Sequence, residues 1–534
     1  MSEPPPFPER DPTHHVAARG SGGAAATTHH LATRVAVEVM ASGGNAVDAA
    51  IAANAVIGVV LPDTCGLGGD LFALVHTPGA AAPAALNASG CAGSGASATR
   101  LRDSGLSAIP LRSPWTVTVP GCVDGWEALL ARFGTRSLGD LLAPAIAAAT
   151  DGFVVTPELS ASLAAIEPLI SAEPSAAALY PEARVPAPGV VLTRPDLAAT
   201  LVALAADGRT GFFGGPVGEG ITGATRGAIT ASDLSVRQAE WMDPLGVAVF
   251  GAHGWTIPPN SQGYLTLAAA WIVEHIGATL GPEDPGYHHS LIEAYRAVAW
   301  ERNDVVADPA TAPLAPAELV DAGRLAARAA AIRTDRIATW PSASPALGGT
   351  TYLCTRDRTG LGVSLIQSNF HGIGSGLAAG ATGVFLHNRG AGFTLEPGHP
   401  NELAPGRRPL HTLSPTLWTS DGELRLLLGT RGGHQQPQLL LQVAAHHLVA
   451  GLTIDAAMAQ PRWTVDPSAS DHVVHVEPAM DQEVVTGLRR AGHRVDLTTG
   501  WEPGWGPVAA IRVDGGAVVA AADPRVSSTC AMTE

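Results

Sequence analysis

A pair of threonines, Thr350 and Thr351, stands where a loop-like part of the sequence gives way to a strand-like part. Residues 340–349 are rich in proline and glycine and lack apolar periodicity, which predicts an exposed connector. Residues 351–357 and 361–366 favour β-structure and flank a turn at 358–360, which is the pattern of a hairpin. Taken alone, a Gly-Thr-Thr sequence before a hairpin is most often an ordinary strand start.

Thr350 also has the chemistry of a self-cleaving nucleophile. A threonine hydroxyl is weak without a neighbouring base, and cleavage of the chain just before Thr350 would make its own α-amine that base. An α-amine has a pKa of about 7.7 to 8.0, close to the pH at which general-base catalysis is most effective. The rest of the sequence decides between this role and the ordinary strand start.

Several further motifs occur in a fixed order along the chain. After the threonine pair they occupy residues 364–376, 383–390, 408–416, 428–433 and 522–525, and before it residues 43–50, 66–72 and 119–121. From about Ala26 to Arg525 this series resembles the γ-glutamyltransferase family of N-terminal-nucleophile hydrolases. The resemblance implies an α+β fold, a four-layer α-β-β-α sandwich. Periodicity alone predicts only mixed helices and strands, with helical spacing over 44–60, 123–149 and 313–332.

The resemblance also implies how the chain is divided. Residues 26–349 would form the large-chain portion and residues 350–534 the small-chain portion of one composite fold, held together as a heterodimer after cleavage. Residues 1–25 are expected to be a mostly flexible arm, because five of the first twelve are proline.

Four residues match the catalytic positions of the family. Thr350 corresponds to the nucleophile. Ser368 stands where the family usually has a second threonine whose hydroxyl contacts the new α-amine, and a serine keeps that hydroxyl. Gly432 and Gly433 match the glycines whose amides form the oxyanion hole, although a tight turn after a strand at 424–428 is the alternative explanation.

The substrate pocket departs from the family pattern. The stretch 86–92 around Ser89 lacks the arginine that binds a γ-glutamyl α-carboxylate, and Gly392 replaces the aspartate that binds the α-ammonium. His411 and Thr412 replace two serines. Arg389, directly after Asn388, stands where the family usually has a neutral amide side chain. The predicted substrate-binding positions are therefore Asn388, Arg389, His411, Thr412, Ser89 and Gly392.

These changes predict a shift in selectivity. Without both charged groups an efficient glutathione hydrolase is not expected, and a guanidinium beside the acyl site favours a carboxylate. The pattern resembles a divergent, cephalosporin-acylase-like branch that takes carboxy-acyl amides such as glutaryl groups. The alternative for Arg389 is a structural ion pair. The short segment 393–408 leaves little room for a long lid.

The predicted activity is hydrolysis or transfer of a small amide or γ-glutamyl-like substrate through an acyl-enzyme. Two alternatives remain open at the sequence level. One is a carbon-carbon bond hydrolase of a natural-product pathway that uses the same nucleophile. The other is a non-catalytic binding protein that retains the fold.

Composition excludes several other classes of function. The net charge is −16 and basic clusters are lacking, which argues against nucleic acid or an anionic membrane surface as partner. The sequence contains no lysine, so it has no phosphate loop ending in Gly-Lys and no Schiff-base lysine. The N-terminus does not resemble a secretory signal and the apolar stretch 46–61 is short, so a cytoplasmic location is expected.

Neither a metal nor a cofactor is expected. Five cysteines are scattered without Cys-x-x-Cys spacing and are predicted to be free thiols: Cys65, Cys91, Cys122, Cys354 and Cys530. Eight of the nineteen histidines form four adjacent pairs, and the side chains of adjacent residues point to different faces of a helix or strand. The glycine-rich residues 372–376 lack the remainder of a dinucleotide-binding fingerprint.

Overall fold

The computed structural model describes residues 16–277, 281–341, 349–465 and 473–534. Two seven-stranded antiparallel sheets form its centre. In spatial order the first contains β1 (Val16–Gly20), β18 (Ala517–Ala522), β17 (Val508–Asp514), β13 (Glu423–Thr430), β12 (Thr416–Ser420), β9 (Ala252–Thr256) and β8 (Leu245–Val249). The second contains β19 (Cys530–Thr533), β2 (Ala24–Thr27), β10 (Gly349–Arg356), β11 (Gly362–Phe370), β3 (Asp70–His76), β4 (Ala84–Ala88) and β7 (Glu240–Met242).

The two sheets face one another across a buried apolar layer. Alternate residues along each strand supply it, since side chains on a strand point to opposite faces. Phe72, Tyr352 and Ile366 come from the second sheet, and Leu417 and Leu427 from the first. This layer sets the position of any side chain that projects from the strand ends into the space between the sheets.

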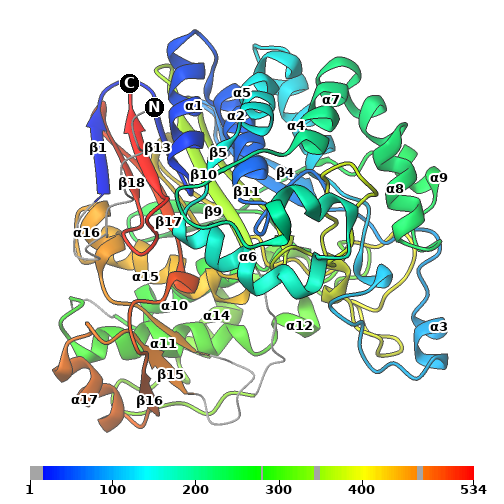
Figure 1. Cartoon of the computed structure of the whole chain (residues 1–534). Helices are drawn as coiled ribbons and strands as arrows, with labels where there is room; N and C mark the ends of the chain where they lie inside the picture. The colour runs from blue at the N-terminus through cyan, green and yellow to red at the C-terminus, as the bar shows by residue number, and fades with distance from the viewer. Residues whose placement is uncertain (1–15, 278–280, 342–348, 466–472) are drawn as a thin grey trace.

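Helices cover the outer face of each sheet (Figure 1). The principal helices against the second sheet are α1 (His30–Ala41), α2 (Ala46–Val60), α4 (Cys122–Phe133), α5 (Leu138–Asp151), α6 (Pro157–Ile170) and α7 (Pro195–Phe213), with α8 (Pro216–Ala224) beside them. On the side of the first sheet, α10 (Tyr264–His275), α15 (Gln436–Leu448) and α16 (Ile454–Ala459) contact its strands, and α11 (Pro285–Ala299), α14 (Ala322–Ala329) and α17 (Gln482–Arg490) pack outside them in the same apolar cluster. The result is the expected α-β-β-α sandwich.

Shorter elements complete the chain. They are α3 (Ala98–Asp103), α9 (Ala231–Ser235), α12 (Arg302–Val305), α13 (Pro316–Leu319), the β5–β6 pair (Phe153–Val154 and Val191–Leu192) and a small sheet of β14 (Trp463–Val465), β15 (Val474–Val476) and β16 (Val495–Leu497).

α2 illustrates how a sequence motif becomes a structural element. Asn45 caps its N-terminus by accepting the Val47 and Asp48 amides, and Asp48 accepts the Asn45 amide in return. Such a capping box fixes the start of a helix. All fifteen residues of α2 are buried, so the apolar stretch noted in the sequence is a core helix. Among the described residues, no helix is both long and apolar enough to cross a bilayer.

Part of the segment 1–25, which was expected to be a mostly flexible arm, forms strands. Residues 16–20 form β1, which pairs with β18 at the edge of the first sheet, and β2 begins at Ala24. Pairing satisfies the backbone groups of these residues, which a flexible arm would leave to water. Residues 1–15 and most of the predicted connector, 342–348, lie outside the described residues. The five cysteines are free thiols, as predicted.

Candidate active site

Thr350 lies at the start of β10, in the predicted hairpin with β11. The pairing shifts register between Gly349 and Thr351, because Gly349 lies opposite Phe370 while Thr351 lies opposite Gln367. A bulge of this kind redirects side chains and is common beside active sites. The Thr350 hydroxyl is fully buried, donates to Ser368 Oγ at 3.3 Å and accepts from Gln436 Nε2 at 3.4 Å.

Ser368 Oγ collects hydrogen bonds from several sides. Besides Thr350, the Phe370 amide donates to it at 2.7 Å and Arg389 Nη2 at 3.5 Å. Phe370 holds this amide in place with a left-handed backbone, φ +74°. Bulky residues rarely adopt that conformation, and it tends to persist at functional sites. The structure thus brings together the predicted nucleophile and the predicted second hydroxyl.

Gly432 and Gly433 form a turn between β13 and the helical segment that begins α15. Both have positive φ, 123° and 57°, which favours glycine. Gln262 donates to the Gly433 carbonyl at 2.9 Å and fixes the turn. Three residues after Gly433, Gln436 donates to the Thr350 hydroxyl. The turn is therefore close in sequence to Gln436, a residue that contacts Thr350. The role of Gly432 and Gly433 in an oxyanion hole stays a prediction.

Arg389 is fully buried and differs from an ordinary buried arginine. Its Nη1 donates to Thr412 Oγ1 at 3.1 Å, and its guanidinium lies 3.9 Å from the centre of the Phe370 ring. Its Nε has no acceptor, and no described carboxylate is within ion-pair distance. Burial lowers the pKa of Arg389 to about 9, so it stays charged at neutral pH. The structural ion pair considered as the alternative is not formed by the described residues.

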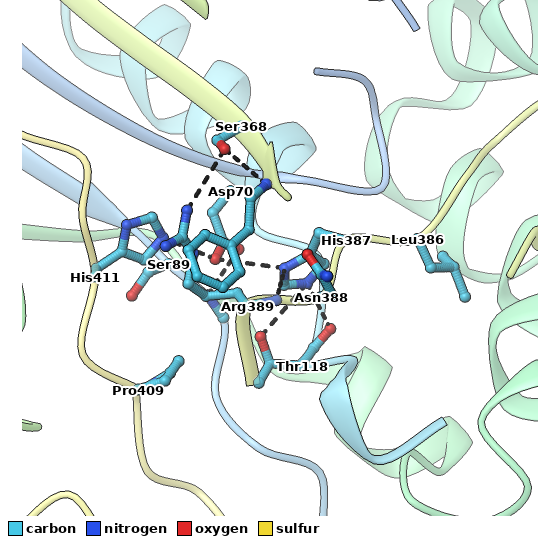
Figure 2. Close-up of polar contacts among 12 residues, drawn as sticks. Asp70, Ser89, Thr118, Ser368, Leu386, His387, Asn388, Arg389, Pro409 and His411 are labelled. Atoms are coloured by element: carbon cyan, nitrogen blue, oxygen red, sulfur yellow. Dashed lines mark hydrogen bonds and ion pairs between the residues drawn. The ribbon is translucent and has the colours of Figure 1, made fainter. Parts of the chain in front are cut away.

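The acid whose charge acts on Arg389 is Asp70, which lies opposite Ser368 in the register of β3 and β11. Figure 2 shows Asp70 in the same cluster as Arg389, His387 and His411. Its carboxylate accepts from the Gly90 amide at 3.1 Å and from His411 Nε2 at 3.1 Å, and His387 Nδ1 lies 3.7 Å away. Burial opposes its charge, yet the His387 and His411 rings and the Arg389 guanidinium hold the pKa of Asp70 below its usual range.

The two histidines of this cluster are neutral at pH 7. Burial and the Arg389 charge lower the pKa of His411 to about 3, and burial lowers the pKa of His387. His411 Nδ1 accepts the Leu413 amide at 3.3 Å, and His387 Nε2 donates to the Thr118 carbonyl at 2.9 Å. Both ring nitrogens of His411 therefore have partners within the protein, and its role in substrate binding stays a prediction.

Three other predicted substrate positions have structural partners. Asn388 accepts the His371 amide and donates to the Leu111 carbonyl, both at 3.0 Å. Ser89 Oγ accepts from Asn260 Nδ2 at 3.0 Å. A Cβ added at Gly392 would lie 2.6 Å from the Leu410 carbonyl oxygen, so the backbone leaves no space for an aspartate there. Of the six predicted positions, Arg389 and Thr412 combine proximity to the nucleophile with unused bonding capacity.

A cavity of about 590 Å³ lies beside this cluster. Phe370 and Thr412, which both contact Arg389, form part of its wall together with Gly392 and Leu410. The short segment 393–408 contributes Phe393 to Glu396, His399 and Asn401 to the wall. A substrate entering here would meet Phe370 and Thr412 before the buried guanidinium.

Sequence reasoning missed Asp70, His387, Phe370 and Gln436. Asp70 and His387 belong to quoted motifs, 66–72 and 383–390, but their role depends on a strand register that a sequence does not display. The positive φ of Phe370 and the contact of Gln436 with Thr350 likewise depend on tertiary structure. In the described residues no group of three or more histidine, cysteine or acidic side chains is arranged to hold a metal ion.

Comparison with known proteins agrees with this geometry. The chain matches the model of the gamma-glutamyltranspeptidase family over residues 32–533. It is 33% identical over 506 residues to the glutathione hydrolase-like YwrD proenzyme of Bacillus subtilis (strain 168), covering 93% of this chain and 96% of the relative. It is also 33% identical over 522 residues to the oxamate amidohydrolase proenzyme of Klebsiella pneumoniae, covering 95% and 98%.

Solved structures give the same result. The cephalosporin acylase from Bacillus halodurans superposes with a TM-score of 0.90 at 30% identity, covering 100% of this chain and 99% of that one. The gamma-glutamyltranspeptidase from Pseudomonas nitroreducens gives a TM-score of 0.52 at 28% identity, covering 58% of this chain and 94% of that one.

Proposed function

The chain belongs to the gamma-glutamyltranspeptidase family, and from this premise we propose that it is a self-processing amidohydrolase that removes a small carboxy-acyl group from an amide. Thr350 is the nucleophile in both processing and turnover. Arg389 binds the carboxylate of the acyl group. The relatives support the class of reaction, since their names include a glutathione hydrolase-like protein, an amidohydrolase and an acylase, and all are proenzymes.

Processing follows from the position of Thr350. Its Oγ attacks the carbonyl carbon of Gly349, the C–N bond to Thr350 breaks, and an ester forms. Water hydrolyses that ester, which leaves residues 1–349 with a new carboxylate and Thr350 with a free α-amine. Ser368, already 3.3 Å from the Thr350 hydroxyl, is placed to orient the new amine.

Turnover uses the same atoms. The α-amine takes the proton of the Thr350 hydroxyl as its oxygen attacks the substrate carbonyl carbon, and it returns that proton to the leaving nitrogen as the C–N bond breaks. Water then hydrolyses the acyl-enzyme to release the acid. In this proposal Gly432 and Gly433 stabilise the tetrahedral oxyanion, where losing one donor typically costs about 10² to 10³ in rate.

The observation that carries the choice of substrate is that the fully buried Arg389 guanidinium has no carboxylate within ion-pair distance among the described residues, and its Nε has no acceptor. Asp70 stabilises this charge from beyond ion-pair distance, and a substrate carboxylate in direct contact would stabilise the buried cation further. The guanidinium lies beside Ser368, which contacts the nucleophile, so a carboxylate bound there belongs to the acyl part of the substrate. The α-ammonium of a γ-glutamyl group would have no acid at Gly392.

The test compares acyl amides with and without a carboxylate in the processed enzyme. Wild type should hydrolyse carboxy-acyl anilides with a higher kcat/KM than neutral acyl anilides of equal length. Arg389→Gln should lower the carboxy-acyl reaction by roughly 10 to 10³ and leave the neutral reaction nearly unchanged, since one charged hydrogen-bond partner is worth about 1.5 to 4 kcal/mol.

Arg425→Gln is a matched control, because Arg425 is half exposed on β13 and its ion pair with Asp514 is long, 3.9 Å. It should behave as wild type. Preference for neutral acyl groups in wild type would contradict the proposal. So would a carboxylate preference that survives in Arg389→Gln.

A further inference from the structure

We infer that the acyl group is short, with its carboxylate one or two carbons beyond the scissile carbonyl, as in oxalyl and malonyl amides. This inference rests on the proposed function and adds a length limit to it. Glutaryl and γ-glutamyl groups, whose terminal carboxylate lies four carbons beyond the carbonyl, fall outside the limit. The argument uses two distances that share one atom, Ser368 Oγ.

The first step is the separation of nucleophile and cation. Thr350 Oγ1 lies 3.3 Å from Ser368 Oγ, and Arg389 Nη2 lies 3.5 Å from the same atom. Two sides of a triangle limit the third, so Thr350 Oγ1 and Arg389 Nη2 are at most about 7 Å apart, little more than two hydrogen-bond lengths.

The second step is the length of the acyl chain. A carboxylate oxygen must come within about 3 Å of the guanidinium, which leaves about 4 Å between it and Thr350 Oγ1 when the three atoms lie in line. With bonds of about 1.2 to 1.5 Å, an extended oxalyl ester spans roughly 3.5 Å and a malonyl ester roughly 4.5 Å. Each further methylene adds roughly 1.3 Å, so an extended glutaryl chain reaches roughly 7 Å.

The third step concerns the space beyond Arg389. A longer chain would still fit if it passed the guanidinium and bound its far side. That side is enclosed, because Phe370 covers one face at 3.9 Å from its ring centre, Thr412 occupies Nη1 at 3.1 Å, and the side chain is fully buried. A glutaryl chain would therefore have to fold back upon itself between Ser368 and Arg389.

The last step concerns the hydrogen bonds left open. Arginine has five N–H donors in one plane. One N–H donor of Arg389 bonds Thr412 Oγ1 at 3.1 Å, and a second bonds Ser368 Oγ weakly at 3.5 Å. The buried Nε donor has no acceptor. Nε and Nη2 lie on one edge of the plane, and a planar carboxylate can bind both at once. Nη2 is the nitrogen that points to Ser368, so this edge faces the nucleophile.

The test is a length series with one leaving group. We would measure aniline release by the processed wild-type enzyme from oxanilate, malonanilate, succinanilate and glutaranilate, with acetanilide as the neutral reference. We expect oxanilate or malonanilate to have the highest kcat/KM and glutaranilate to fall at least about tenfold below it, since one misfitting methylene is typically worth about 10- to 200-fold.

The outcomes separate the two claims. If glutaranilate equals or exceeds malonanilate while Arg389→Gln still abolishes the preference for carboxylates, the length limit is wrong and the proposed function stands. If acetanilide is preferred, or if the processed enzyme cleaves none of the four acids, the proposed function fails and the length limit fails with it. The wild-type series requires no variant, so a folding defect in Arg389→Gln cannot obscure the result.

Discussion

A single oxygen, Ser368 Oγ, contacts both Thr350, the proposed nucleophile, and Arg389, the proposed carboxylate-binding residue. It accepts from Thr350, Phe370 and Arg389, so its position is fixed by three separate segments of the chain. A serine here keeps the hydroxyl that the family usually supplies from threonine. These contacts support the proposed role of Ser368 in orienting Thr350.

Removal of this hydroxyl should slow both reactions of Thr350. We expect Ser368→Ala to mature more slowly and to turn over more slowly once mature, and Ser368→Thr to be tolerated. Densitometry of the two fragments over time and steady-state kinetics of the processed protein measure the two effects. Ser364→Ala is the control, because Ser364 lies on the same strand and bonds Tyr352 and the Thr416 carbonyl away from the site. Equal maturation and turnover of Ser368→Ala and wild type would contradict the assignment.

Gly392, where the family's glutathione-type pattern has an aspartate, lies against the backbone of Leu410. The missing aspartate is more than a missing charge, because the Leu410 carbonyl fills the space its Cβ would need. The surrounding backbone has adapted to glycine. The difference from the family's glutathione-type pattern is thus built into the loop as well as the side chain.

At the scale of elements, the β10–β11 hairpin contains both Thr350 and Ser368, on which the proposed chemistry depends. Its bulge brings Thr350 to Ser368, and its start at Gly349 places the bond to be cut at the first pair of the ladder. The neighbouring Thr351 has a different partner, Thr64 Oγ1 at 2.9 Å. Two adjacent threonines therefore have separate roles, which gives a matched pair for mutation.

We expect wild type to separate into residues 1–349 and 350–534 on denaturing gels. Thr350→Ala should remain a single chain, because it has no oxygen to attack Gly349, whereas Thr351→Ala should still be cut. Intact mass spectrometry of both fragments locates the cut. An active wild type that stays in one piece would contradict the nucleophile assignment, and so would cleavage before Thr351.

α11 holds the chain segment that leads to the connector. His289, Glu293 and Arg296 share one face of this helix, and their side chains bond the backbone of Arg333 and Ala338. Glu293 and Arg296 also form a buried ion pair. The described chain is thus fixed up to the start of the undescribed residues before Thr350.

Local elements could be predicted from sequence, and non-local ones could not. The hairpin around 358–360 has turn residues between apolar runs, and the structure contains it. The place of β2 between β19 and β10 has no local signal, since it unites residues near both ends of the chain. The site divides in the same way. The pairing of Thr350 with Ser368 followed from family motifs, while Asp70 beside Arg389 required the register of β3 and β11.

At the scale of the whole molecule, the sheets interleave the two predicted portions of the chain. In the second sheet, β10 and β11 from the small-chain portion lie between β2 and β3 from the large-chain portion. In the first sheet, β12 of the small-chain portion pairs with β9 of the large-chain portion, and β18 of the small-chain portion pairs with β1 of the large-chain portion. Cleavage before Thr350 would therefore leave two chains that share both sheets, and separating them would break strand pairs at several places (Figure 1).

Buried neutral histidines distributed over the molecule should make it sensitive to acid. Burial lowers the pKa of His29, His411 and His493 to about 3 and that of His288 to about 4. In the unfolded chain these groups titrate near 6.5, so below that pH the unfolded state binds more protons than the folded one. The stability that these neutral histidines contribute to the folded state is fully present above about pH 6.5. It is lost as the pH falls toward the folded-state pKa, about 4 for His288 and about 3 for the other three.

We expect the free energy of unfolding to decrease steeply between pH 6.5 and 4.5, with each such histidine contributing up to about 1.4 kcal/mol per pH unit. Urea titrations of the single-chain Thr350→Ala protein at several pH values measure the slope without dissociation of fragments. His493→Gln should flatten it by about one histidine's share, since His493 meets His289 at 2.8 Å and an amide can keep that hydrogen bond without titrating. A stability that is level from pH 7.5 to 5 would show that these histidines are protonated without cost in the folded state.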